Sequence, residues 1–189
     1  MSETLERVEE NFGNYLSRLN FIYKNQTITT KCIKDHPGVP ILGETYGPYQ
    51  KDKEYNLKFF IALPFIKNGY LRVKDTEKCD NVDVMNYAIE EGDNESLIRR
   101  ENKYFLNKIK EFRYFMEREV EKKSRPEVEL KRYKSYHASI VDSRLSKLLR
   151  LAKVDLSLND EQKLTNSEIG LFNQFSRKIK IWRDFFLNR

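Results

Sequence analysis

The chain has few of the residues from which metal sites and redox centres are built. Its 189 residues include two cysteines and two histidines. Cys32 and Cys79 are too far apart for a metal-binding Cys-x-x-Cys pair, and they do not make a disulfide framework. His36 and His137 are too few for a histidine-based metal site. We therefore expect two inert, half-buried thiols and no metal or cofactor.

Catalytic motifs are also missing. The sequence contains no Gly-rich phosphate-binding loop of either common type and no Gly-x-Ser-x-Gly elbow. Cys32 and His36 are four residues apart but have no third group to orient them as a nucleophile and base. We interpret His137 as a partly exposed polar residue of a helix. These observations argue against an enzyme.

Long apolar runs are absent, and glycine and proline are scarce, at 7 and 5 residues. No run approaches the roughly 18 apolar residues that span a bilayer. The N-terminal segment is acidic and amphipathic, unlike a signal peptide. We expect an intracellular protein with no membrane contact and little disorder.

Positive charge is concentrated in one region. Residues 98–153 carry 17 basic and 8 acidic side chains, whereas residues 1–97 carry 12 and 16. This region is interpreted either as a nucleic-acid footprint or as a helix surface that meets an acidic partner. The tyrosines and phenylalanines are interpreted either as base-stacking residues or, because most have helical core spacing, as packing residues.

The residue pattern of the first part of the chain predicts a helix followed by a small β-rich domain. Apolar residues from Leu5 to Ile22 recur at three- and four-residue steps, which predicts an amphipathic helix over 3–23. Pro64 should kink the next helix or mark its start, and Asn68-Gly69 should end it. The predicted elements are strands at 27–34, 39–42 and 70–73, a loop at 43–49 continuing into a charged loop, and a helix at 57–68.

The residue pattern of the second part of the chain predicts a series of helices. Asp80 and Asp83 have the spacing of capping residues, and Thr165-x-x-Glu168 is a capping box. The predicted helices cover 81–89, 95–123, 127–153 and 165–187, with a polar loop at 155–163. The fold class is therefore α+β: an amphipathic helix (1–24), a small β-rich docking domain (25–78) and a helical bundle domain (80–189).

The wide apolar faces of the long helices allow two interpretations. They form a self-contained helical core, or their excess apolar surface is an oligomer interface. Eight residues are candidates for this core and interface, with the two basic ones as polar anchors: Arg144, Leu145, Lys147, Leu148, Leu149, Phe172, Phe175 and Trp182.

Two groups of segments resemble a known family. Val39-Pro40-Ile41-Leu42, Gly47-Pro48-Tyr49, Lys53-Glu54-Tyr55, Leu57 to Ala62 and Lys67 to Tyr70 resemble the small β domain of archaeal GINS subunits. The segment from Asp142 to Ala152, followed by Leu164-Thr165-x-x-Glu168-x-x-Leu171-Phe172, is similar to the helical domain shared by all GINS subunits. The β-first order resembles the class related to the second and third eukaryotic partner subunits.

The resemblance implies a non-catalytic scaffold in archaeal DNA replication. Subunits of this family form a tetramer, which bridges the MCM helicase and a Cdc45/RecJ-like protein in the replicative helicase, and archaeal complexes also contact primase. Contact with DNA is compatible with this role but not required by it. A cytoplasmic, nucleoid-associated location follows. The alternative is a stand-alone basic nucleic-acid-binding protein that uses residues 98–153; an enzyme comes third.

Overall fold

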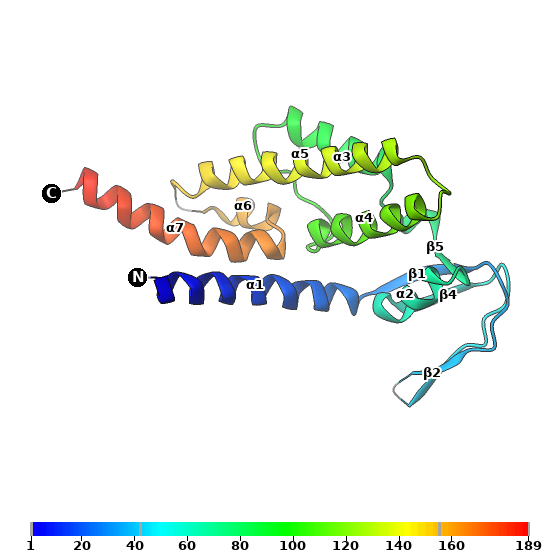
Figure 1. The fold of residues 1–189 in the computed structure, drawn as a ribbon. Coiled ribbons are helices and arrows are strands. Elements are labelled where there is room, and N and C mark those ends of the chain that lie inside the picture. Colours follow the sequence, from blue (N-terminus) through cyan, green and yellow to red (C-terminus); the bar gives the residue numbers. More distant parts are fainter. Residues whose placement is uncertain (1, 42, 155, 189) are drawn as a thin grey trace. The chain divides into compact units, whose positions relative to one another are not determined.

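The computed structural model describes residues 2–41, 43–154 and 156–188, and it describes side chains from residue 11 onward. The chain divides into two compact units. One contains residues 20–78, and the other contains residues 1–19 together with 79–189. The helix α1 (Ser2–Lys24) contributes to both units (Figure 1). The α+β class is confirmed, with the strands in the N-terminal half and helices after them.

The β-rich unit is built on a three-stranded antiparallel sheet of order β4-β1-β5. The central strand β1 (Thr27–Cys32) pairs with β4 (Glu54–Lys58) on one side and β5 (Leu71–Val73) on the other. Alternate residues of β1 point inward, and Ile28, Thr30 and Cys32 are buried. This period of two is the pattern that a half-buried strand requires.

The short helix α2 (Phe59–Lys67) supplies most of the core of this unit. Ile61 and Phe65 pack with Cys32, Tyr49 and Leu71. Pro64 lies inside the helix, where it removes one backbone donor, so a helix start at Pro64 is wrong. Gly69 ends the helix with φ +74, as the Asn-Gly pair predicts.

Two strands of the β-rich unit were predicted as loops. β3 (Glu44–Tyr46) pairs with β2 (Val39–Ile41) in a separate hairpin, and the expected end of β2 at Leu42 lies outside the described residues. β4 was predicted as part of the charged loop. Its charges lie on the exposed face while Tyr55 and Leu57 turn inward, so its alternation was a usable signal.

In the helical unit, α5 (Glu127–Leu151) packs along α3 (Asn81–Asp93) and α4 (Phe105–Glu121) (Figure 1). Tyr133 is completely buried, and its hydroxyl donates to the carbonyl of Ile109 at 3.0 Å. α3 begins as predicted, because the Asp80 carboxylate accepts from the Val82 amide and Asp83 reaches back to the Asp80 amide. A reciprocal cap of this kind satisfies two otherwise unpaired donors.

The predicted helix over 95–123 is wrong in its first ten residues. Residues 95–104 run between α3 and α4 without helical structure. The Asn102 side chain accepts locally from the Tyr104 amide, whereas the Lys103 ammonium donates to the carbonyls of Gln162 and Leu164, which are 59 and 61 residues away in the sequence. These distant partners compete with the helix for the same segment.

The last part of the chain forms α6 (Leu158–Lys163) and α7 (Asn166–Leu187). A loop was predicted over 155–163; its start at Asp155 lies outside the described residues, but 158–163 is helical. The Ser157 hydroxyl accepts from the Asp160 amide at 3.1 Å and caps α6. α7 begins at the predicted capping box, where the Thr165 amide donates to Glu168 at 2.7 Å.

The N-terminal part of α1 packs against the first half of α7. The Tyr15 hydroxyl donates to the carbonyl of Asn166 at 2.8 Å. Gly170 allows this approach, because a side-chain carbon there would overlap the ring of Tyr15. The helix predicted over 3–23 is confirmed, although the side chains of Leu5 and Val8 lie outside those described.

Candidate functional site

The two basic residues of the helical motif lie inside the helical unit. Arg144 is 1% exposed, and Lys147 is 4% exposed. Both point from α5 toward α3 and the segments that flank α6. A charged side chain is rarely buried this completely unless it is paired, so their partners decide what the pair does.

The guanidinium of Arg144 joins four parts of the chain: α3, the 95–104 segment, α6 and α7. It donates from Nε and Nη2 to the two carboxylate oxygens of Glu168, at 2.6 and 2.8 Å. It also donates from Nη1 to Glu91 at 2.6 Å and to the carbonyl of Ile98 at 3.1 Å, and from Nη2 to the carbonyl of Lys163 at 3.1 Å. The planar fork of arginine is suited to such a bidentate carboxylate contact.

Glu91 is the second centre of this ion cluster. It is fully buried near the end of α3. Besides Arg144, its carboxylate accepts from Lys147 at 2.9 Å and from Arg100 at 2.9 Å, and its carbonyl accepts from the Lys147 ammonium at 2.6 Å. The cluster of Arg144, Lys147, Arg100, Glu91 and Glu168 therefore ties α3, the 95–104 segment, α5 and α7 together.

Glu168 has two functions in this cluster. Its Oε2 accepts from the Thr165 amide, which closes the capping box, and from Arg144 Nη2. The same carboxylate therefore starts α7 and fixes that start to α5. The sequence motifs Arg144-x-x-Lys147 and Thr165-x-x-Glu168 meet at this point, although neither motif reveals the contact.

The charges within the cluster stabilise one another. Burial disfavours the ionised form of Glu91, but the charge of Arg144, together with bonds from Lys147 and Arg144, outweighs burial and lowers the pKa of Glu91 below its ordinary value. Burial also opposes the charge of Arg144, and its carboxylate partners raise the pKa of Arg144. Glu91 and Arg144 are thus ionised near neutral pH.

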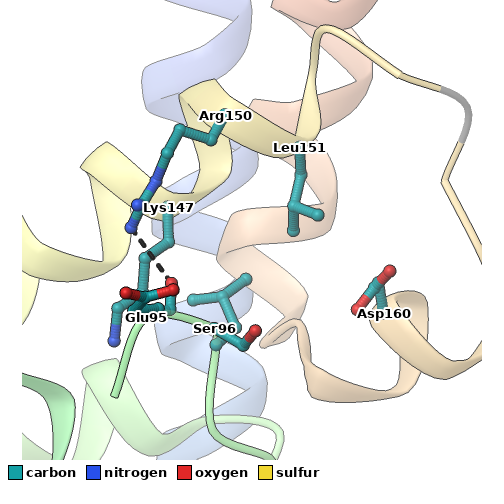
Figure 2. A pocket seen from close by; sticks show the side chains of 7 residues that line it. Glu95, Ser96, Lys147, Arg150, Leu151 and Asp160 are labelled. Atoms are coloured by element: carbon teal, nitrogen blue, oxygen red, sulfur yellow. Dashed lines mark hydrogen bonds between the residues drawn. The ribbon is translucent and has the colours of Figure 1, made fainter. Parts of the chain in front are cut away.

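A small pocket lies beside the cluster (Figure 2). It has a volume of about 240 Å³, and Arg150 crosses it to donate to the carbonyl of Glu95 at 3.0 Å. Lys147 and Arg150 balance Glu95 and Asp160 in its lining, so it has no preference for either charge. Its remaining lining residues are Ser96, Leu97 and Leu151.

Apolar side chains are partly exposed on another face of α5, beside the one that carries Arg144 and Lys147. Val141, Leu145 and Leu149 are 40%, 37% and 42% exposed and are spaced four residues apart. This spacing places them on one face of the helix. They form a narrow, partly covered stripe rather than a core.

The distal half of α7 exposes a larger apolar surface, here called the aromatic face. Trp182 packs against Phe186, and Phe185 packs against Phe186, both with ring centroids 5.0 Å apart. The face consists of residues that are 61–78% exposed: Ile181, Trp182, Phe185 and Phe186. Contiguous large apolar side chains at this exposure are uncommon on monomeric proteins and mark interaction surfaces.

The eight predicted core and interface residues therefore fall into separate environments. Leu148 and Phe172 lie in one buried cluster, and Phe175 packs at its edge. Leu145, Leu149 and Trp182 are exposed. Arg144 and Lys147 are buried in the ion cluster, so they are internal anchors rather than surface anchors.

The residues weighed for catalysis have other partners. The Cys32 thiol donates to the carbonyl of Lys34 at 3.0 Å, and His36 Nδ1 accepts from the Gly38 amide at 3.0 Å. Both cysteines are fully buried rather than half-buried, and burial raises the pKa of Cys79 to about 12. His137 is partly exposed, and burial with the nearby charge of Arg113 lowers its pKa.

The described residues contain neither a cluster of metal ligands nor a membrane-spanning helix. In the described ranges, no group of three or more histidine, cysteine, aspartate or glutamate side chains is arranged to hold a metal ion. None of the helices, as far as the structure describes them, is long and apolar enough to cross a membrane.

The basic excess of residues 98–153 is partly neutralised. At least eight of its seventeen cationic side chains form ion pairs. Examples on the surface are Arg125 with Glu119 and Glu129, and Lys134 with Glu117. Interleaved carboxylates reduce the positive potential that a phosphate backbone would meet.

Sequence reasoning did not identify Glu91 or Arg100 as members of the cluster. The helix predicted over 81–89 stopped short of Glu91, and Arg100 was placed in the helix predicted over 95–123. The available signal for Glu91 was its position in a helix with Val84 and Ala88, at a spacing that shares their buried face.

Known proteins do not identify the chain: no family model matches it, and a search of curated proteins found no significant match.

Proposed function

We propose that this protein is a non-catalytic GINS-type subunit, of the class with the small β domain first. It would form a tetramer with other GINS subunits and scaffold the MCM helicase and a Cdc45/RecJ-like protein in archaeal chromosomal DNA replication. The identification rests on the resemblance of the two motif groups described above. The β-rich unit would be the docking module.

One observation carries the assembly part of the proposal. The aromatic face exposes Ile181, Trp182, Phe185 and Phe186 on a helix whose first half is anchored by the buried side chains of Glu168 and Phe172. Burying one such side chain contributes about 1.5–3 kcal/mol, so leaving four exposed is unfavourable for an isolated monomer. A subunit interface accounts for this surface.

The ion cluster supports the same proposal indirectly. The distal half of α7 can present a defined surface only if the first half of the helix is fixed. Glu168 fixes it through Arg144, and Phe172 packs beneath it. Binding surfaces on rigid elements lose less entropy on association.

The test is co-expression of this chain with a second GINS subunit, followed by size-exclusion chromatography with light scattering. We expect a complex of the mass of a tetramer. The triple variant Trp182→Ser, Phe185→Ser and Phe186→Ser should abolish it. The matched control, Val82→Ser with Ile89→Ser, changes exposed apolar residues of α3 and should leave assembly intact.

A stable 22.7 kDa monomer that ignores the second subunit would overturn the proposal. The alternative, a stand-alone nucleic-acid-binding protein, makes a different prediction. It requires tight single-strand binding by the isolated chain, with an affinity that falls steeply with salt because several counterions are released.

A further inference from the structure

A second surface of α7 has a different chemical character. A groove of about 410 Å³ lies between the residues that follow α5 (152–154 and 156) and one side of α7. Ala152, Val154, Leu156 and Phe172 supply its apolar lining. Four cationic side chains, Lys153, Arg177, Lys180 and Arg183, also line it, against one described carboxylate, Asp184.

We propose that this basic groove binds an acidic amphipathic segment of a partner protein. The segment would place apolar side chains against Val154 and Leu156 and its carboxylates against the cations. This is the usual way in which an amphipathic helix occupies an apolar groove, with charges fixing its register. The proposal concerns a surface other than the aromatic face, so either can fail alone.

Charge is the first argument for an acidic occupant. Within the part of the chain that the structure describes, Lys153, Arg177 and Arg183 form no ion pair. This contrasts with α4 and α5, where Arg113, Arg118 and other cations pair with glutamates along the helices. Clustered cations of one sign create a potential that attracts an anionic partner.

The apolar lining is the argument for a protein rather than a nucleic acid. Single-stranded nucleic acids are held by aromatic faces on which bases stack. The only aromatic side chain among the described lining residues is Phe172, and it is 6% exposed. Val154, in contrast, is 64% exposed. An aliphatic wall suits leucine, isoleucine or methionine side chains better than bases.

Helix geometry separates the groove from the aromatic face. Arg177, Lys180 and Arg183 follow one another at three-residue steps and share one side of α7. Trp182 and Phe185 lie on the opposite side by the same geometry. The distal half of α7 therefore offers two chemically distinct sides, one basic and one aromatic.

The test uses the full chain and a fluorescein-labelled synthetic helical peptide with leucine on one face and glutamate on the other. Fluorescence anisotropy should show saturable binding. The variant Arg177→Gln with Arg183→Gln should weaken it at least about tenfold, which is about 1.4 kcal/mol. The control variant Lys110→Gln with Arg132→Gln removes two exposed cations elsewhere and should bind as the unaltered chain does.

A further variant and a second peptide test the apolar and the ionic contacts separately. Val154→Ser tests the apolar wall and should weaken binding several-fold, while a glutamine-for-glutamate peptide should bind at least tenfold more weakly. The proposal is overturned if the peptide does not bind, or if both double variants weaken binding equally. It is also overturned if an oligothymidylate binds through Arg177 and Arg183 and the peptide does not. Circular dichroism confirms that each variant is folded.

Discussion

The two halves of α7 are both helical, but they differ in burial and in the contacts that their side chains make. In residues 166–175, Glu168 is held by Arg144, Phe172 is buried, and Gly170 contacts Tyr15. In residues 181–188 every side chain is exposed, including four large apolar ones that form the aromatic face. A helix can thus be fixed at one end so that the other end is presented for binding, and the following predictions test that division.

The largest effect is expected from Arg144→Ala. This change leaves Glu168 and part of Glu91 buried without their main partner, and breaking a buried pair in this way costs about 3–5 kcal/mol. The free energy of unfolding from urea denaturation measures it. Arg150→Ala, which removes one exposed bond to the Glu95 carbonyl, is the control and should cost less than about 1 kcal/mol. Equal losses would contradict an anchor at Arg144.

The two phenylalanines Phe172 and Phe185 compare the halves of α7 directly. Phe172→Ala should destabilise the chain by about 3–5 kcal/mol, because it opens a cavity in a packed cluster. Phe185 is 78% exposed, so Phe185→Ala should change stability by less than about 0.5 kcal/mol. If the two losses were similar in the isolated chain, the distal half would not be a free surface.

Lowering the pH should weaken the anchored half. The pKa of Glu91 is lower in the folded chain than its ordinary value of 4.5. The contribution of Glu91 to the free energy of unfolding is therefore present above the pKa that Glu91 has in the unfolded chain. It is lost as the pH falls through the pKa of Glu91 in the folded chain. The Glu91→Gln variant lacks this carboxylate. Below about pH 4.5, its free energy of unfolding should therefore change less steeply with pH than that of the unaltered chain, by up to about 1.4 kcal/mol per pH unit. An unchanged slope would rule out this coupling.

The contact between α1 and α7 can be tested with two glycines in helices. Gly170→Ala should destabilise the chain despite the higher helix propensity of alanine, because the new methyl group would overlap the ring of Tyr15. Gly13→Ala meets no atom within 4 Å and should stabilise the chain by about 0.5–1 kcal/mol. Thermal unfolding would report both, and stabilisation by Gly170→Ala would contradict the contact.

A small effect on folding but a large one on assembly is expected from removing residues 181–189. The described side chains of this segment are exposed, so its loss should cost less than about 1 kcal/mol. Assembly with a second subunit should nevertheless be lost with the aromatic face. A truncated chain that still assembles would place the interface elsewhere.

Local patterns predicted much of the fold. The capping boxes at Asp80 and Thr165 mark the starts of α3 and α7, and the apolar periodicity of 127–153 matches α5. These signals succeed because a cap and its helix lie within a few residues of each other. The strand β4 and the helix α6 were missed although their alternation and the Ser157 cap were visible.

The candidate site was less predictable. Arg144 and Lys147 were predicted as polar anchors of this helix, but their burial and their partners were not evident. Glu91 is more than fifty residues from both of them in the sequence. A long helix predicted over 95–123 also hid Arg100, which lies in the non-helical segment and reaches Glu91.

The sequence by itself determined where most helices begin, which strand alternates inward and where the charge is concentrated, because these properties depend on neighbouring residues. Only the tertiary structure decided that residues 95–104 are not helical, that five charged side chains meet in one cluster and that α7 is anchored by buried side chains in one half and exposed in the other. Those outcomes depend on partners far apart in the chain, whose pairing outweighs local propensity.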